Sequence, residues 1–223
     1  MSEPYKDGHT LHTNIRVLRK TNQLKYLHTM LRNKNSSRNE FIFASDRLVR
    51  ILIEEGLNQL PMIEQEVLTP TGNVYFGVKP QGKIMAALVL RAAYSGEKPF
   101  RETCRGIRIG NILIQRNDET AEPKLYYAKL PQDSDKRTCL LFDPMLATGG
   151  TACTAIKVLL DNGIPENKII FLNVIAAPEG INRIKSEYPD VCVLTTEVDS
   201  CLNDLNYILP GCGDYGDRYF GTY

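Results

Sequence analysis

Residues 140–151 are the part of the chain that most limits its possible folds. Leu140, Leu141 and Phe142 form an apolar run, Asp143 follows it, and small residues lead to Gly149, Gly150 and Thr151. Residues 151–162 then carry apolar side chains at helical spacing: Ala152, Ala155, Ile156, Leu159 and Leu160. Gly163 stands where a helix end favours a positive φ. The segment predicts a buried strand, a tight loop and a helix, which is the unit of an α/β fold.

This arrangement is suited to binding a sugar phosphate. The backbone N–H groups of residues 147–151 would lie at a helix N-terminus, where unsatisfied donors and the helix dipole favour a phosphate. Asp143 would project from the carboxyl end of the strand, where open α/β sheets bind ligands, and could accept hydrogen bonds from ribose hydroxyls. The residues alone also allow a plain connection with a solvated acid.

The remaining pattern predicts one domain over residues 1–223, with residues 1–14 as a flexible polar tail. Ser37 and Glu40 have the spacing of a capping box and start a helix that runs to Gly56. Strands are expected within residues 67–78, around a turn at 70–73, and then at 83–91, 108–116, 124–130, 139–142, 168–177 and 191–198, with a helix at 178–188. The alternation predicts an α/β fold: a parallel sheet with flanking helices, a β-hairpin or flap, and an N-terminal helical arm.

Two arginines stand at predicted strand ends. Arg91 and Arg116 close the strands at 83–91 and 108–116, so both would meet Asp143 at one edge of the sheet. Guanidinium groups grip phosphates bidentately, which suits a polyphosphate. Exposed salt bridges are the alternative interpretation.

Composition excludes several classes of function. The net charge is +1 and no apolar run is long enough to span a bilayer, so we expect neither a nucleic-acid nor a membrane partner. All three histidines lie within the first 28 residues and are expected on the surface of the N-terminal arm, which argues against histidine-based catalysis and against a histidine-ligated metal site. Six cysteines without a C-x-x-C pair, and no visible secretory signal, indicate reduced thiols and a cytoplasmic protein, with the nucleus as an alternative.

The C-terminal segment is rich in glycine. Gly211, Gly213 and Gly216 match G-x-G-x-x-G in form, but too few residues follow for a dinucleotide-binding βαβ unit. Glycines among aspartates and aromatics favour a loop whose backbone approaches a planar ligand closely. We expect its removal to leave a folded sheet core.

Taken together, these segments resemble the uracil phosphoribosyltransferase family, in its eukaryotic branch. The matching strings are DPMLATGGT at 143–151, ILPGCGDYGDRYFG at 208–221, AAPEG at 176–180 and RGIRIGNILIQRNDETAEPKL at 105–125. The resemblance runs from about residue 30 to the end. It implies a phosphoribosyltransferase that joins uracil to phosphoribosyl pyrophosphate (PRPP), giving uridine monophosphate (UMP) and pyrophosphate.

The resemblance also implies roles for individual residues. Catalysis would rest on Asp143, Arg116 and Asp214. PRPP would contact Arg91, Arg116, Asp143, Pro144, Met145, Leu146, Ala147, Thr148, Gly149, Gly150, Thr151 and Asp214. Uracil would contact Ile208, Gly213, Asp214 and Tyr215, largely through backbone groups. Mg²⁺ would accompany the pyrophosphate without direct ligation by the protein. GTP would activate a homodimer or homotetramer through Arg38, Arg47, Gln81, Gly82, Lys83, Ile84 and Arg108.

One segment departs from the family pattern. The family reads Arg-Ala-Gly-Glu-Ser-Met where this chain reads RAAYSG at 91–96. If Ala93 must hold a positive φ, the strain would be roughly 1–2 kcal/mol. This leaves a weakly active or inactive relative that senses uracil or a nucleotide as the alternative function. A phosphoribosyltransferase for another base is a third interpretation, which Pro144 and the C-terminal loop disfavour.

Overall fold

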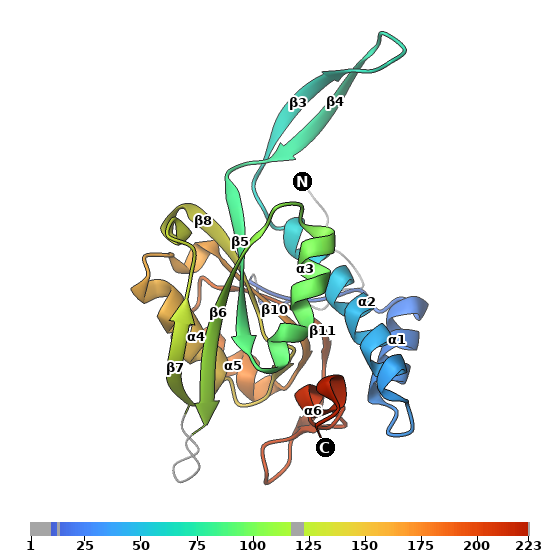
Figure 1. Cartoon of the computed structure of the whole chain (residues 1–223), viewed down its shortest axis with the longest axis vertical. Coiled ribbons are helices and arrows are strands. Elements are labelled where there is room, and N and C mark those ends of the chain that lie inside the picture. The colour runs from blue at the N-terminus through green and yellow to red at the C-terminus, as the bar shows by residue number, and fades with distance from the viewer. Residues whose placement is uncertain (1–9, 13, 117–122, 223) are drawn as a thin grey trace.

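The computed structural model describes residues 10–12, 14–116 and 123–222 (Figure 1). Within the predicted tail, Thr10–His12 forms a short strand, and residues 1–9 and 13 lie outside the described part. A nine-stranded sheet has the order β1-β2-β11-β10-β8-β5-β6-β7, with β9 paired to β10. Its strands are β1 (Thr10–His12), β2 (Ile15–Val17), β5 (Lys83–Leu90), β6 (Arg108–Arg116), β7 (Pro123–Lys129), β8 (Arg137–Phe142), β9 (Met145–Leu146), β10 (Ile169–Ala176) and β11 (Cys192–Val198).

The centre of the sheet is parallel, as predicted. Pairing is parallel from β2 through β11, β10, β8 and β5 to β6, and antiparallel only at the two ends, where β1 meets β2 and β7 meets β6. Every residue of β10 is buried, which agrees with a strand that is covered on both faces. The carboxyl ends of these strands therefore share one edge, and Asp143 and Arg91 directly follow β8 and β5 there.

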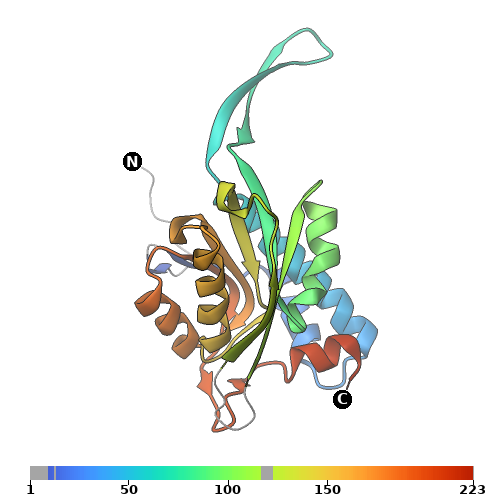
Figure 2. The same cartoon turned by 60° about the vertical axis from the view of Figure 1, so that its left-hand side comes forward.

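Helices cover both faces of the sheet (Figure 2). One layer holds α1 (Asn22–Arg32), α2 (Arg38–Leu57) and α3 (Glu97–Thr103), and the other holds α4 (Gly150–Asp161) and α5 (Pro178–Glu187). α2 begins at the predicted capping box, in which Ser37 and Glu40 bond each other's backbone N–H, and it packs on β10 and β11. Short 3₁₀ turns lie at Ala92–Gly96 (η1), Ser134–Lys136 (η2) and Glu166–Lys168 (η3). No helix in the described ranges is both long and apolar enough to cross a bilayer.

The sequence analysis predicts an N-terminal helical arm but gives no separate helix at the position of α1, although its signals are present. Thr21 caps it by accepting the Leu24 N–H at 3.1 Å, and its buried side chains fall at helical spacing: Leu24, Leu27, His28 and Leu31. Because this stripe faces α2 and the sheet, the expectation that all three histidines are surface residues is wrong for His28, which is 5% exposed. His9 lies outside the described residues, and the structure does not describe the side chain of His12.

A two-stranded hairpin projects from the sheet. β3 (Met62–Leu68) and β4 (Val74–Pro80) pair antiparallel over their whole length, around the predicted turn at 70–73, and extend well beyond the layers (Figure 1). Leu68 and Phe76 are exposed by 74% and 73%. Near the C-terminus, β12 (Cys201–Leu202) pairs with β13 (Ile208–Leu209), and α6 (Tyr215–Phe220) ends the described fold.

Candidate active site

A cavity of about 350 Å³ opens at the carboxyl edge of the sheet. Three segments that are distant in the sequence meet in it: the loop after β8, the turn after β5 and the C-terminal loop. Its lining residues are Ala92, Met145, Ala147, Leu205, Asn206, Tyr207, Ile208, Gly213, Asp214, Tyr215 and Gly216. The structure therefore brings together the predicted phosphate loop and the predicted uracil-binding residues.

The loop after β8 ends at the N-terminus of α4, as predicted. Gly149 caps this helix with φ +81°, a conformation that L side chains rarely adopt, and the first turn leaves backbone N–H donors without intrahelical partners. The loop is held from below because Ala177 N–H donates to the Leu146 carbonyl at 2.8 Å. A Cβ added to Gly180 would lie 2.5 Å from the Ala147 oxygen, so α5 can approach the loop only with glycine at that position.

Asp143 is fixed at the floor of the site. It is 9% exposed, its N–H donates to the Leu172 carbonyl at 3.2 Å, and its carboxylate Oδ1 accepts the Met145 N–H at 3.4 Å. Asn173 Nδ2 donates to the Asp143 carbonyl oxygen at 3.2 Å, and Thr195 in turn donates to Asn173 at 2.9 Å. These hydrogen bonds fix the backbone at Asp143 and help to orient its carboxylate.

The C-terminal loop places Asp214 at the cavity and Tyr215 in the core. Asp214 is exposed and caps α6, where its Oδ1 accepts the Asp217 N–H at 2.8 Å. Tyr215 is 2% exposed, its hydroxyl bonds Ser45 of α2, and burial raises its pKa. Tyr215 can therefore meet a ligand only through its backbone. Because its side chain packs against α2, removal of this loop would also take a buried aromatic ring out of the core, and the folding of the remaining sheet stays a prediction.

The two arginines have different surroundings. Arg91 donates to the Asp217 carboxylate at 2.6 Å and to the Thr222 hydroxyl at 3.0 Å, so the turn after β5 is tied to α6. The Thr222 hydroxyl and the Arg91 guanidinium hold the pKa of Asp217 below its usual value. The backbone of Arg116 pairs with Pro123 at the end of β6, and its side chain lies outside what the structure describes.

The departure at residues 91–96 does not require a positive φ at Ala93. Ala93 lies fully buried in η1, and Asn206 is the one non-glycine with positive φ among the described residues. A Cβ at Gly96 would lie 2.6 Å from the Phe142 ring, so this glycine lets η1 pack directly on the strand that carries Asp143. The supposed cost at Ala93 is absent because its backbone is helical.

The residues predicted for GTP do not form one cluster within the chain. Gln81, Gly82 and Lys83 line a cavity of about 690 Å³ at the amino edge of the sheet, at the start of β5, and Arg108 follows at the start of β6. Arg38 lies at the other edge, where its Nε donates to the Tyr219 carbonyl at 2.9 Å. Arg47 lies on α2 over the Phe43 ring, 5.7 Å from the ring centre.

Sequence reasoning missed one wall of the cavity. Leu205, Asn206 and Tyr207 form the turn between β12 and β13. Asn203 shapes this turn because its Oδ1 accepts the N–H groups of Leu205 and Tyr207 at 3.0 and 2.8 Å. This turn could have been predicted from the sequence, because Asn203 and Asp204 are residues that favour turns.

Comparisons with known proteins identify the family of this chain. The family model for uracil phosphoribosyltransferase matches residues 17–222. The chain is 52% identical to uracil phosphoribosyltransferase of Dictyostelium discoideum over 209 residues, covering 94% of this chain and 97% of the relative. It is 48% identical to that of Saccharomyces cerevisiae, covering 98% of both. A solved protein structure from Aquifex aeolicus superposes with a TM-score of 0.82 at 31% identity, covering 93% of this chain and 98% of the other. The chain therefore belongs to the uracil phosphoribosyltransferase family.

Proposed function

We propose that this phosphoribosyltransferase transfers the 5-phosphoribosyl group of PRPP to uracil, giving UMP and pyrophosphate in pyrimidine salvage. The observation that carries the proposal is the single cavity shared by Met145 and Ala147 of the phosphate loop and by Ile208, Gly213 and Asp214 of the C-terminal loop. A phosphosugar and a planar base would meet in this cavity. Family membership supports the same reaction.

Each part of the site has a role in this reaction. The N–H donors at the start of α4 would hold the 5-phosphate, and Asp143 would accept the ribose hydroxyls. Cleavage of the C1–O bond places negative charge on the leaving pyrophosphate, and cations stabilise that charge. Arg91 would supply one such cation, but it is paired with Asp217, so PRPP has to compete with this carboxylate for the guanidinium. Arg116 is proposed as the second.

Magnesium fits the donors that the cavity offers. Mg²⁺ is usually bound through one or two carboxylates together with water and substrate phosphates. Asp214 is an exposed carboxylate on the cavity wall that could hold Mg²⁺ through a bound water, while substrate oxygens would supply the direct ligands. Bound Mg²⁺ would neutralise charge on the pyrophosphate.

The proposal is tested by measuring UMP and pyrophosphate formation with uracil, cytosine or hypoxanthine as the acceptor, with PRPP and Mg²⁺ present. We expect product with uracil only, and loss of product in Asp143→Asn. Uracil binding without turnover in the wild type would favour the sensor alternative, although Ala93 does not hold the positive φ that was part of its support.

We also propose that the chain forms a homo-oligomer through the β3–β4 hairpin. An isolated two-stranded hairpin is marginal in water. This one exposes large apolar side chains, with Val74, Phe76 and Val78 on one face of β4 and Tyr75 on the other, and Leu68 paired with Val74. A second copy of the chain would cover them and make a homodimer, or a homotetramer if dimers pair. Light scattering should show that Phe76→Asp combined with Val78→Asp lowers the mass to that of one chain. An unchanged mass would refute this role.

GTP activation and a cytoplasmic or nuclear location remain proposals. Because Arg38 and the group at Gln81–Ile84 lie at opposite edges of the sheet, a site that uses both would need two chains. We therefore expect any GTP response to depend on protein concentration, and activity measured across dilutions with and without GTP tests this. All six cysteines are free thiols, which supports a reducing compartment, and fractionation of cells tests it.

A further inference from the structure

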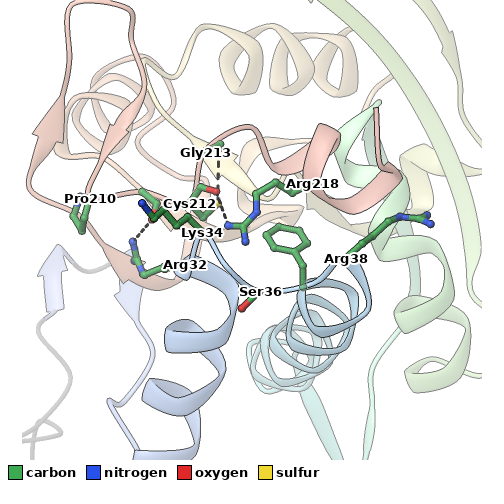
Figure 3. A pocket seen from close by; sticks show the side chains of 10 residues that line it. Arg32, Lys34, Ser36, Arg38, Pro210, Cys212, Gly213 and Arg218 are labelled. Carbon is green, nitrogen blue, oxygen red and sulfur yellow. Dashed lines mark hydrogen bonds between the residues drawn. The ribbon is translucent and has the colours of Figure 1, made fainter. Parts of the chain in front are cut away.

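Residues 210–213 connect β13 to the cap of α6 and will be called the 210–213 turn. Gly213 lines the candidate active site on one side. On the other side the turn borders a second cavity, of about 420 Å³, whose walls include Arg32 and Arg218 (Figure 3). Gly211 and Gly213 have φ +59° and +78°, so this backbone depends on residues that are intrinsically flexible.

One ion pair holds both backbone groups of Gly211. Arg32, the last residue of α1, binds Asp199 bidentately, with both N–O distances at 2.7 Å. Asp199 Oδ2 also accepts the Gly211 N–H at 2.8 Å, and Arg32 Nη1 also donates to the Gly211 carbonyl at 2.9 Å. The side chain of Asp199 is only 4% exposed, so this pair is largely removed from water.

A second arginine holds the next residue from the other side. Arg218 Nη1 donates to the Cys212 carbonyl at 2.9 Å and to the carbonyl of Leu31 in α1 at 2.6 Å. Its Nη2 donates to the Asn33 carbonyl at 2.7 Å, and the guanidinium lies over the Phe41 ring, 4.4 Å from the ring centre. The end of α1 is thereby joined to the 210–213 turn by two independent guanidinium groups.

We propose that Arg32 and Asp199 are positioning residues for the base: their ion pair sets the 210–213 turn so that the backbone at Gly213 and Asp214 is placed for uracil before uracil arrives. The inference rests on the proposed function. Backbone groups can recognise a base only if they are held close to the geometry of the bound complex. A glycine-rich turn is flexible and does not fix that geometry by itself. If the loop were ordered only when uracil binds, the free-energy cost of ordering it would lower the affinity for uracil.

The structure offers a matched control on the opposite edge of the sheet. Arg137 also binds an aspartate, Asp133, bidentately, with N–O distances of 2.8 and 2.7 Å. It also donates to one backbone carbonyl, that of Ile84, at 3.0 Å. Arg→Lys keeps the charge at either position but removes the planar fork. A merely structural role would make the two substitutions equivalent.

The experiment compares Arg32→Lys with Arg137→Lys in the full chain. A displacement of about 1 Å in a site costs on the order of 100-fold. We expect Arg32→Lys to raise the KM for uracil by about 10- to 100-fold, while PRPP binding measured without uracil changes less than about twofold, and Arg137→Lys to change neither. Equal changes in the uracil KM for both variants would overturn the proposal, as would a parallel loss of PRPP binding.

Hydrogen exchange gives a readout that does not need turnover. In Asp199→Asn, we expect the Gly211 amide to exchange at least about tenfold faster than in the wild type, with amides of β10 unchanged. Unchanged exchange at Gly211 would refute the role of the ion pair whether or not the protein makes UMP. Absence of UMP in the wild type, with Gly211 protected, would instead refute the proposed function alone.

Discussion

His28 should make the stability of this protein depend on pH between about 6.5 and 4. Burial, and then the nearby Arg32, lower the pKa of His28 from 6.5 to about 4, while Asp199 raises it and Lys20 lowers it further. The hydrogen bonding around His28 explains why its protonated form is disfavoured in the folded protein. The Thr196 hydroxyl donates to the Val174 carbonyl, so it can only accept from His28 Nε2, at 2.9 Å. Nδ1 is then the unprotonated nitrogen, and it has no hydrogen-bond partner in the described part of the chain.

Proton linkage gives the sign and the size of this pH dependence of stability. The folded pKa is lower than the unfolded pKa, so below pH 6.5 the unfolded chain takes up a proton that the folded chain excludes. Stability is complete above pH 6.5 and falls by about 1.4 kcal/mol per pH unit until about pH 4. Between pH 7 and pH 5 the loss from this one group is about 2 kcal/mol.

Urea unfolding of the wild type and His28→Gln, at one protein concentration, tests this from pH 7 to pH 5. Gln keeps a donor for Thr196 but does not titrate, and the difference between the two proteins cancels the other histidines and the carboxylates. We expect His28→Gln to be less stable at pH 7 and to lose about 2 kcal/mol less than the wild type on going to pH 5. Parallel pH profiles for the two proteins would show that His28 is not excluded from protonation in the folded state.

Three further substitutions test the site. Arg116→Ala should lower kcat by about 10²–10³-fold by removing a donor to the leaving group, and an unchanged kcat in steady-state assays would remove Arg116 from the pyrophosphate site. Gly180→Ala should weaken PRPP binding at least about tenfold, because the added Cβ would meet the Ala147 oxygen. Titration with PRPP measures the affinity, with Ala177→Gly, also at a buried position, as a control for local packing. An unchanged affinity in Gly180→Ala would contradict this prediction. Ala93→Gly should lower stability by roughly 1 kcal/mol and leave kcat/KM unchanged, since η1 is unstrained; a gain in kcat/KM would revive the explanation by strain.

Much of the fold was predictable because its signals are local. The apolar run of β10, the capping box at Ser37 and the loop from Asp143 to Gly149 each reflect hydrogen bonding or burial within one stretch of sequence. Their order predicts a parallel sheet, and a parallel sheet places Asp143 and Arg91 at one edge. α1 also carries a cap and an apolar stripe, so its bounds could have been predicted within the N-terminal helical arm.

The rest depended on contacts between residues far apart in the chain. Local sequence determined that a phosphate loop and a glycine-rich loop exist, since turn chemistry and helix caps act over a few residues. Only the tertiary structure decided that His28 is buried against Thr196, that Arg91 is paired with Asp217, and that Arg32 and Asp199 hold Gly211. Except for Asp199 and Gly211, the two residues of each pair are more than a hundred positions apart in the sequence. The hydrophobic periodicity of one segment cannot predict a contact between two such distant segments. Burial and ion pairing between distant residues depend on how the helices pack on the sheet, so only the tertiary structure shows these features.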